Sequence, residues 1–477
     1  MNFKTLVALS SALVLVAALV PAQETNQVEQ LKKQLQQLQE NFERVQREQR
    51  QQIEALQKQI EALQQTQARA PTAALAAPPP AATPPELKQP WSPSQPLTLA
   101  GGGKNYLNLS FDALFAAGSS SAEDVEKLQL GGHDPNQRGF TVQNLELTLN
   151  GAVDPYLRGQ VNLIYQIDSA GESIFEVEEA FLETTSLPAN LQLKAGQFFT
   201  EFGRLNPQHP HTWSFVDQPL VNGRFFGPDG LRNPGARVSW LLPTPFYAEL
   251  FLAVQDSHGE TAHSFRNDNE GELLFGRPTT QGRLKAFGDL LFTPRLATSF
   301  DLSDTQTLLL GTSAALGPNG SGARTDTQIY GLDWFWKWKP ARQHGGFPFV
   351  SWQIEALLRR YDAAAYDGLL DPGNPTLPLP AERLTDYGVY SQVSYGFRKG
   401  WVAALRGDWV SGDRGALSPD PDRDPRWRVA PNLTWYPSEF SKVRLQYNYD
   451  DRENLGTDHS VWVQFEFLLG AHGAHKF

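Results

Sequence analysis

From about residue 97 onward, apolar and polar residues alternate along many short segments of the chain. LNLSFDA at residues 107–113 and VRLQYNY at residues 443–449 have an apolar residue at every second position and a polar one between. VWVQFEF at residues 461–467 follows the same pattern, with Trp462 among the polar positions. A period of two predicts β-strands with one apolar and one polar face.

The length and number of these segments indicate what kind of β-structure they form. We count sixteen, each about ten residues long, from near Asn105–Phe115 to near His459–Leu469. Strands of β-sandwiches are usually about five or six residues long, whereas a tilted strand needs about ten to cross hydrocarbon. The sequence therefore predicts an all-β fold, a transmembrane antiparallel β-barrel of about 16 strands.

The connections between the segments support a barrel independently. Short links such as Pro243–Pro245 and Arg398–Gly400 alternate with long polar stretches such as 200–234. Two links that should be long, 169–174 and 451–458, are only moderate in length. Outer-membrane barrels have short periplasmic turns and longer outside loops, so the alternation predicts an outer-membrane protein.

The first residues predict export from the cytoplasm. Lys4 precedes an apolar run from Leu6 to Val20, and Val20 and Ala22 are small residues suited to a cleavage site. The run of about 15 residues is too short to span a bilayer comfortably. Residues 1–22 are therefore predicted to be a signal peptide, and an uncleaved membrane anchor is the alternative.

Two further segments precede the predicted barrel domain at 97–477. Residues 24–66 space apolar side chains three and four apart among Gln, Glu, Lys and Arg. This pattern predicts an α-helical coiled coil in the periplasm that needs partner helices, and a solitary charged helix or disorder is the alternative. Residues 67–96 are rich in proline and alanine and predict an extended linker.

Composition excludes several functions. The net charge of -11 argues against a nucleic-acid partner, which needs a basic surface. The chain has no cysteine and no sequence motif of a nucleophilic elbow, phosphate loop or zinc-protease helix, so we expect no enzyme and no cofactor. The carboxylate pairs Asp450–Asp451 and Glu178–Glu179 are too common a pattern to indicate a site.

Several features together resemble the phosphate-selective porin O and P family. They are the signal, the Gln-rich coiled coil, the Pro-rich linker, IFEVEEAFLETT at Ile174–Thr185 and LQLKAGQFFTEFGRLNP at Leu191–Pro207. The GAHGAHKF tail resembles a subgroup described as zinc-regulated outer-membrane proteins. The resemblance implies a sixteen-stranded, trimeric channel. Basic residues along the pore mark the phosphate-selective members, and no such ladder can be matched here residue by residue.

The end of the chain resembles the signal by which bacterial outer-membrane proteins reach their barrel assembly machinery. That signal is a last strand ending in an aromatic residue, and this chain ends in Phe477. Phe477 lies eight residues beyond Leu469, whereas the usual signal ends the strand itself. The resemblance implies the assembly machinery and outer-membrane lipids as partners.

The stretch from Phe202 to Arg237 is the candidate for a pore constriction. Its four arginines outnumber its two aspartates, and its Pro, Gly and aromatic content predicts an ordered loop. A loop folded into the lumen would narrow it and favour anions, with Phe225 and Phe226 holding the loop against the wall. The alternative is an outside loop that packs on neighbouring loops or subunits. The constriction candidates are Arg204, Arg224, Arg232 and Asp217.

Two histidine pairs are weak candidates for a metal site. They are His209 with His211, and His472 with His475. Imidazoles suit zinc, but a usable site needs three or four converging ligands, which neither pair supplies alone. Solvated histidines without a metal are the simpler interpretation.

These observations predict a channel of the bacterial outer membrane for passive diffusion of small hydrophilic solutes or ions, with a preference for anions. The alternative is a structural anchor that links the membrane to the periplasmic layer through the coiled coil. A receptor that needs energy input would carry a folded plug ahead of 22 strands. The residues before Leu97 cannot form one.

Overall fold

The computed structural model describes residues 95–102, 105–267, 273–279, 284–370 and 378–470. The chain divides into two compact units, Met1–Gln89 and Pro90–Phe477, and all described residues belong to the second. The predicted signal peptide, the predicted coiled coil and most of the predicted linker lie outside the described residues. The same holds for the terminal segment that contains His472, His475 and Phe477.

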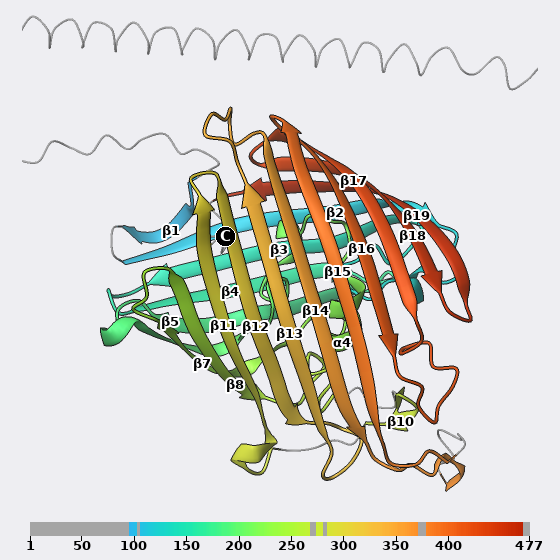
Figure 1. Cartoon of the computed structure of the whole chain (residues 1–477). Coiled ribbons are helices and arrows are strands. Elements are labelled where there is room, and N and C mark those ends of the chain that lie inside the picture. Colours follow the sequence, from blue (N-terminus) through green and yellow to red (C-terminus); the bar gives the residue numbers. More distant parts are fainter. Residues whose placement is uncertain (1–94, 103–104, 268–272, 280–283, 371–377, 471–477) are drawn as a thin grey trace, which may run out of the picture. The chain divides into compact units, whose positions relative to one another are not determined.

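Sixteen antiparallel strands form one closed barrel (Figure 1), which confirms the predicted fold and strand number. Strands consecutive around the barrel pair with each other, and the ring closes where β19 pairs with β2. The strands are β2 (Asn105–Ser120), β3 (Gly139–Ala152), β4 (Leu157–Ile167), β5 (Ser173–Thr184), β6 (Leu191–Phe199), β7 (Arg232–Leu241), β8 (Tyr247–Asp256), β11 (Leu290–Ser303), β12 (Gln306–Pro318), β13 (Asp326–Trp338), β14 (Phe349–Ala363), β15 (Glu382–Arg398), β16 (Trp401–Gly412), β17 (Arg426–Ser438), β18 (Ser441–Arg452) and β19 (Gly456–Leu469).

A few short elements complete the described chain. Strand β1 (Leu97–Gly102) pairs with the beginning of β2, the part of that strand that β19 does not reach. None of the helices among the described residues has the length and apolarity to cross a bilayer. The remaining elements are β9 (Leu273–Leu274), β10 (Arg277–Pro278), α3 (Val125–Leu128), α4 (Leu220–Phe226) and the 3-10 turns η1 (Pro188–Asn190), η2 (Pro210–Thr212), η3 (Phe287–Asp289) and η4 (Gly368–Leu370).

Short and long links alternate between the strands, as the sequence predicts. The link from β15 to β16 is residues 399–400, whereas the link from β6 to β7 is residues 200–231. Two links on the long side, 168–172 and 453–455, are short, which matches the exceptions in the sequence.

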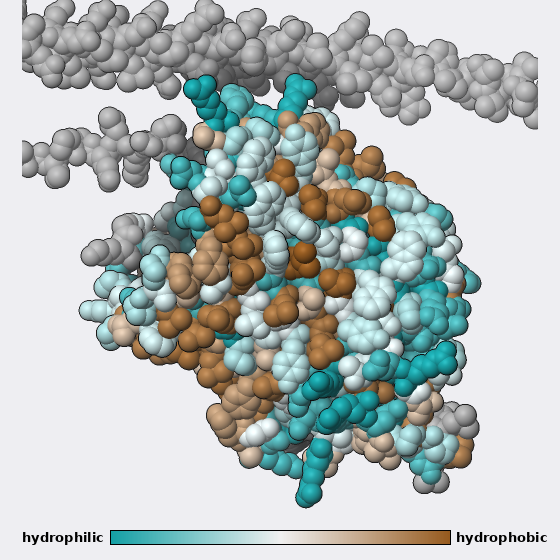
Figure 2. Space-filling view, viewed as in Figure 1, coloured by the Kyte–Doolittle hydropathy of each residue, from teal (hydrophilic) through white to brown (hydrophobic). Residues whose placement is uncertain are grey.

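The two faces of the barrel have opposite chemistry. On β17, Trp427, Val429 and Leu433 are exposed on the outer surface, whereas Arg428 and Asn432 are buried on the inner side. Figure 2 shows apolar side chains gathered on one outer face of the barrel. A water-soluble barrel would have the reverse arrangement, so this pattern is that of strands in contact with lipid.

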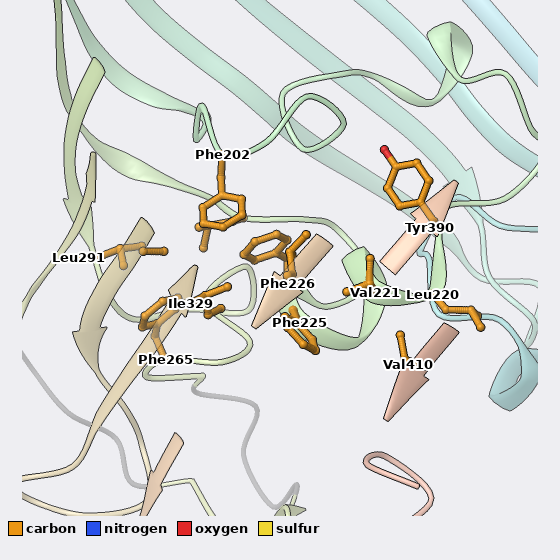
Figure 3. Packing of buried hydrophobic residues seen from close by; sticks show 14 residues of the cluster. Phe202, Leu220, Val221, Phe225, Phe226, Phe265, Leu291, Ile329, Tyr390 and Val410 are labelled. Carbon is orange, nitrogen blue, oxygen red and sulfur yellow. The ribbon is translucent and has the colours of Figure 1, made fainter. Parts of the chain in front are cut away.

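The link at 200–231 folds into the barrel, as expected for a constriction loop, and we call it the inward loop. Its helix α4 packs against the inner faces of β11–β16, where Phe225 and Phe226 belong to one buried cluster with Ile329 and Leu357 (Figure 3). Each of these four side chains is at most 4% exposed. The apolar part of the loop therefore fixes it to the wall through ordinary core packing.

The lipid-facing surface predicts how a charge will be tolerated. Leu445 points outward near the middle of β18, and Leu455 lies in the short link that follows this strand. Leu445→Arg should lower the free energy of unfolding by about 2–4 kcal/mol in lipid vesicles, because a charge would enter the hydrocarbon layer. Leu455→Arg is the matched control and should cost less than about 1 kcal/mol. Equal losses, measured by urea titration, would contradict this orientation of β18.

Candidate functional site

The inward loop begins where the pairing of β5 with β6 is short. These strands pair only between Ala180–Glu183 and Lys194–Gln197, so the chain can leave the wall after β6. The loop is closed at its base by Thr200, whose N–H donates to the carbonyl of Leu231 at 3.0 Å. The two ends of the loop are thereby held together while its middle reaches across the lumen.

The inner face of the barrel has two regions of opposite charge. We call the first the acidic wall, because its buried charged side chains, among the described residues of β2–β5, are all carboxylates. They are Asp112, Glu146, Glu178, Glu179 and Glu183. We call the second, on β14–β18, the basic wall. Its buried basic side chains are Arg359, Arg406, Arg426, Arg428, Lys442 and Arg444, and its buried acidic ones are Glu355, Asp386, Asp408 and Asp450.

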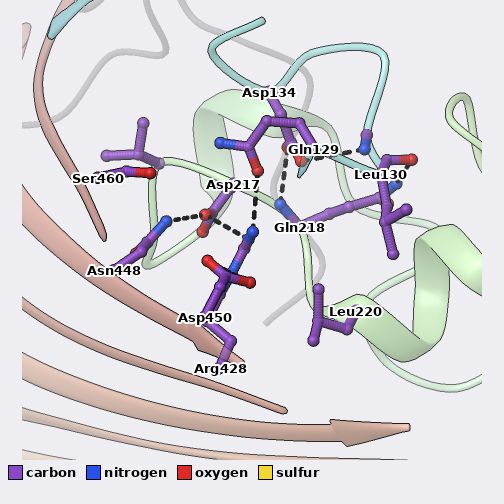
Figure 4. Close-up of polar contacts among 12 residues, drawn as sticks. Gln129, Leu130, Asp134, Asp217, Gln218, Leu220, Arg428, Asn448, Asp450 and Ser460 are labelled. Carbon is purple, nitrogen blue, oxygen red and sulfur yellow. Dashed lines mark hydrogen bonds and ion pairs between the residues drawn. The ribbon is translucent and has the colours of Figure 1, made fainter. Parts of the chain in front are cut away.

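Asp217 joins the inward loop to the basic wall. Its two carboxylate oxygens lie 2.8 Å from Arg406 and 2.7 Å from Arg428, and they also accept hydrogen bonds from the amides of Gln446 and Asn448. Figure 4 shows Arg428 and Asn448 converging on this carboxylate. Burial alone would raise the pKa of Asp217, but the two guanidinium groups lower it to about 2. The side chain is therefore a fully paired buried anion.

The basic wall also binds the main chain of the loop. Arg444 donates to the carbonyl of Trp213 at 2.9 Å, and Arg359 donates to that of Arg224 at 3.0 Å. Lys442 donates to the carbonyl of His211. These side chains compensate their own burial with carbonyl acceptors that the irregular loop would otherwise leave without partners.

The opposite side of the loop meets the acidic wall. His209 Nδ1 lies 2.7 Å from Glu178 and 3.4 Å from Glu146, and its Nε2 lies 3.0 Å from Glu179. His211 Nδ1 lies 3.2 Å from Glu146. Burial disfavours an imidazolium, but Glu146 and Glu178 hold the pKa of His209 well above its ordinary value. The interpretation of His209 and His211 as solvated side chains is therefore wrong, because both bind carboxylates inside the barrel.

A β-bulge explains why two consecutive glutamates reach the same cluster. Asn162 pairs with Glu179 while the next residue, Leu163, pairs with Val177, so Glu178 is an extra residue in the ladder. In regular pairing, neighbouring side chains point to opposite faces, and the bulge turns both glutamates inward. The alternation of apolar and polar residues did not predict the bulge. Two adjacent charged residues within a predicted transmembrane strand are the signal that could have indicated it, since neither can face lipid.

The arginine candidates do not converge on one point. Arg204 stacks on Phe335 at 3.9 Å, and Arg224 is 8% exposed and donates to the carbonyl of Asp424 at 2.9 Å. Arg232 binds Glu176 from within β7. The expected loop extended to Arg237, but β7 starts at Arg232, so Arg232 and Arg237 are part of the wall. Burial, together with neighbouring arginines, lowers the pKa of Arg224 to about 10, which leaves it charged at neutral pH.

An uncharacterized protein of Aquifex aeolicus (strain VF5) is 30% identical to this chain over 411 residues. The match covers 78% of this chain and 79% of that protein. No protein-family model matches the chain.

Among solved structures, the course of the chain is similar to that of outer-membrane porins and channels. The outer-membrane channel DcaP of Acinetobacter baumannii is 12% identical with a TM-score of 0.46, covering 76% of this chain and 97% of that one. The anion-selective porin from Comamonas acidovorans is 8% identical with a TM-score of 0.46, covering 76% of this chain and 100% of that one.

The contacts of Asp217 predict a large effect of removing its charge. Asp217→Asn keeps the shape of the side chain but leaves Arg406 and Arg428 with less compensation in a buried place. We expect the free energy of unfolding to fall by about 3–5 kcal/mol at pH 7, as when one partner of a buried ion pair is removed. Asp304→Asn, in the exposed turn between β11 and β12, is the matched control and should change it by less than about 0.5 kcal/mol.

The pH dependence of stability in wild type and in Asp217→Asn gives a second test of these contacts. The pKa of Asp217 is about 2 in the fold against an ordinary 3.8, so its contribution is present above pH 4 and is lost as pH falls through 2. The stability difference between wild type and Asp217→Asn should therefore be constant from pH 7 to pH 4 and shrink between pH 4 and pH 2. A difference that already vanished at pH 5 would mean that the two arginines do not hold this carboxylate.

Proposed function

We propose that this chain, which belongs to the same family as the uncharacterized Aquifex aeolicus protein, forms a porin-like channel in the bacterial outer membrane. The observation that carries the proposal is a closed sixteen-stranded barrel, apolar outside and polar inside, with a loop folded into its lumen. Charged and amide side chains along the inner face suit small hydrophilic solutes or ions and offer no path for apolar ones.

We further propose that the channel prefers anions. The basic wall has six buried basic side chains against four buried acidic ones. From the inward loop, Asp217 adds one negative charge to this wall and Arg224 one positive charge, so the excess stays positive. A narrow lumen with low-dielectric walls concentrates the field of such charges. The acidic wall opposes this effect, but His209 and His211 compensate part of its charge. Phosphate, suggested by the resemblance to the phosphate-selective porin O and P family, is one anion to include in the test.

One observation favours the alternative of a structural anchor. The inward loop packs so closely that Arg428, Arg444 and Tyr390 on the wall are each at most 1% exposed. A lumen filled in this way could be closed, and the barrel would then serve to hold the predicted coiled coil at the membrane. Conductance separates the two functions, because an anchor needs none.

The predicted assembly belongs to the same proposal. A coiled coil at residues 24–66 needs partner helices, which supports a homotrimer with the helices in the periplasm. Phe477 supports recognition by the barrel assembly machinery, and the apolar outer face supports contact with outer-membrane lipids.

The channel is tested by single-channel recording of the purified protein in planar bilayers. We expect discrete conductance steps and, in a gradient of potassium chloride or potassium phosphate, a reversal potential that indicates anion preference. Arg224→Glu should shift this potential toward cations, because the substitution reverses a charge where the lumen is narrow. The absence of any conductance would contradict the channel and leave the anchor.

Arg324→Glu is the matched control for selectivity. Arg324 is exposed in the link between β12 and β13, where salt screens its charge within about 8 Å. We expect little change in its reversal potential. If Arg224→Glu behaved like this control, Arg224 would lie outside the path of the ions.

The trimer is tested by deleting residues 24–66. We expect the deletion to weaken the trimer in detergent, measured by light scattering, while circular dichroism still shows a folded barrel. The reason is that the coiled coil needs partners, whereas the sixteen strands close on themselves. A trimer of unchanged stability would place the subunit contacts in the barrel instead.

A further inference from the structure

We propose that Glu146, Glu178 and His209 form a binding site for a divalent transition-metal cation between the inward loop and the acidic wall. One ligand atom from each residue lies within 4.8 Å of the other two. The two carboxylates come from β3 and β5, and the imidazole comes from the loop. A bound cation would therefore join the loop to the wall at a point remote in sequence from both strands.

The spacing of these atoms fits a metal with little movement. His209 Nδ1 lies 2.7 Å from an oxygen of Glu178 and 3.4 Å from one of Glu146. Around a tetrahedral cation with bonds of about 2.0–2.2 Å, neighbouring ligand atoms are roughly 3.3–3.5 Å apart. The distance to Glu146 already has this value, and the distance to Glu178 needs a shift of only part of an ångström. The oxygens of Glu146 and Glu178 lie within 4.8 Å of each other and would move closer together on binding. A water molecule would complete four ligands, as at zinc sites with three protein ligands.

The surrounding groups hold these ligands as metal sites require. His209 directs Nδ1 into the site, while its Nε2 lies 3.0 Å from Glu179. In metal sites, a carboxylate on the second ring nitrogen of a histidine ligand commonly fixes the orientation of the ring. Glu146 Oε1 accepts hydrogen bonds from Thr148 at 3.0 Å and from Asn162, whereas Oε2, the oxygen near His209, accepts a long one from Asn144 at 3.5 Å. His209 and Glu146 are thereby oriented mainly through atoms other than the two that would bind the metal, although Glu146 Oε2 also lies 3.2 Å from His211.

Asp112 is an independent sign that positive charge belongs here. It pairs directly with Glu146 across β2 and β3, is 0% exposed, and neither of its oxygens has a hydrogen-bond partner among the described residues. Leaving a buried carboxylate without partners is costly. Together with Glu178 and Glu179, four carboxylates face His209 and His211 of the loop and the buried His133, whose Nε2 lies 3.6 Å from Glu178. A divalent cation would compensate the remaining negative charge.

The ligand types select the class of metal. An imidazole is a poor ligand for Ca²⁺ or Mg²⁺, which prefer oxygen, and it suits zinc and its first-row neighbours. The absence of cysteine from the chain fits the same class with nitrogen and oxygen ligands. The alternative is that His209 is an imidazolium bound to carboxylates, with no metal in any condition.

The test uses the full mature protein, purified in detergent and stripped of metal with EDTA. We expect it to bind one Co²⁺ per chain at this site, with visible absorption bands as intense as those of tetrahedral Co²⁺. We also expect Zn²⁺ to displace the Co²⁺. His209→Ala and Glu178→Gln should weaken binding at least tenfold, and Glu179→Gln about 10–100-fold by releasing the imidazole. His344→Ala, an exposed histidine in the link between β13 and β14, should leave affinity unchanged.

A second measurement keeps the proposal testable if a variant fails to fold. X-ray absorption of the wild-type protein loaded with one equivalent of Zn²⁺ should show one imidazole among oxygen ligands. The measurement is repeated in the double variant His472→Ala/His475→Ala, which removes the histidines of the tail, and we expect the same spectrum. No binding by the wild type, unchanged affinity in His209→Ala, or loss of binding in the tail variant would each overturn the proposal. None of these results depends on whether the barrel conducts.

Discussion

Charge that is buried between the barrel wall and the inward loop is the constraint on which the rest of this structure depends. Lipid outside forces the charged side chains inward, and the inward loop then removes much of the inner face from solvent. Arg406 and Arg428 are each 1% exposed, so each needs an anion within contact distance. Asp217 binds both. The position of the loop follows from this need as much as from its apolar packing.

The loop meets three surfaces of different chemistry, and each accepts only one part of it. His209 lies on carboxylates, Asp217 on guanidinium groups, and Phe226 in an apolar cluster. A shift of the loop along the barrel would place at least one of these groups against a surface of the wrong kind. Such a loop has one stable position, which a selective constriction requires.

The sequence was sufficient for the features that depend on local pattern. A period of two assigned the inner and outer faces correctly, including Trp462, which is buried inside with the polar residues of β19. It could not identify partners, because Asp217 and Arg406 are 189 residues apart and no spacing rule connects them. The period of two also failed to predict side-chain orientation and strand boundaries where the pairing of strands is irregular. The bulge beside Glu178 turns two glutamates inward, and the first residue of β7, Arg232, was assigned to the loop.

The distance in sequence between the loop and its partners has a consequence for biogenesis. Asp217 is synthesised well before Arg428 and Asn448, which follow it in the chain by 211 and 231 residues. During synthesis, the first half of the barrel therefore has carboxylates and loop carbonyls whose partners have not yet been made. Contacts this remote form late and slowly. The loop can reach its position only after the last strands arrive, so insertion of the barrel and docking of the loop are coupled events.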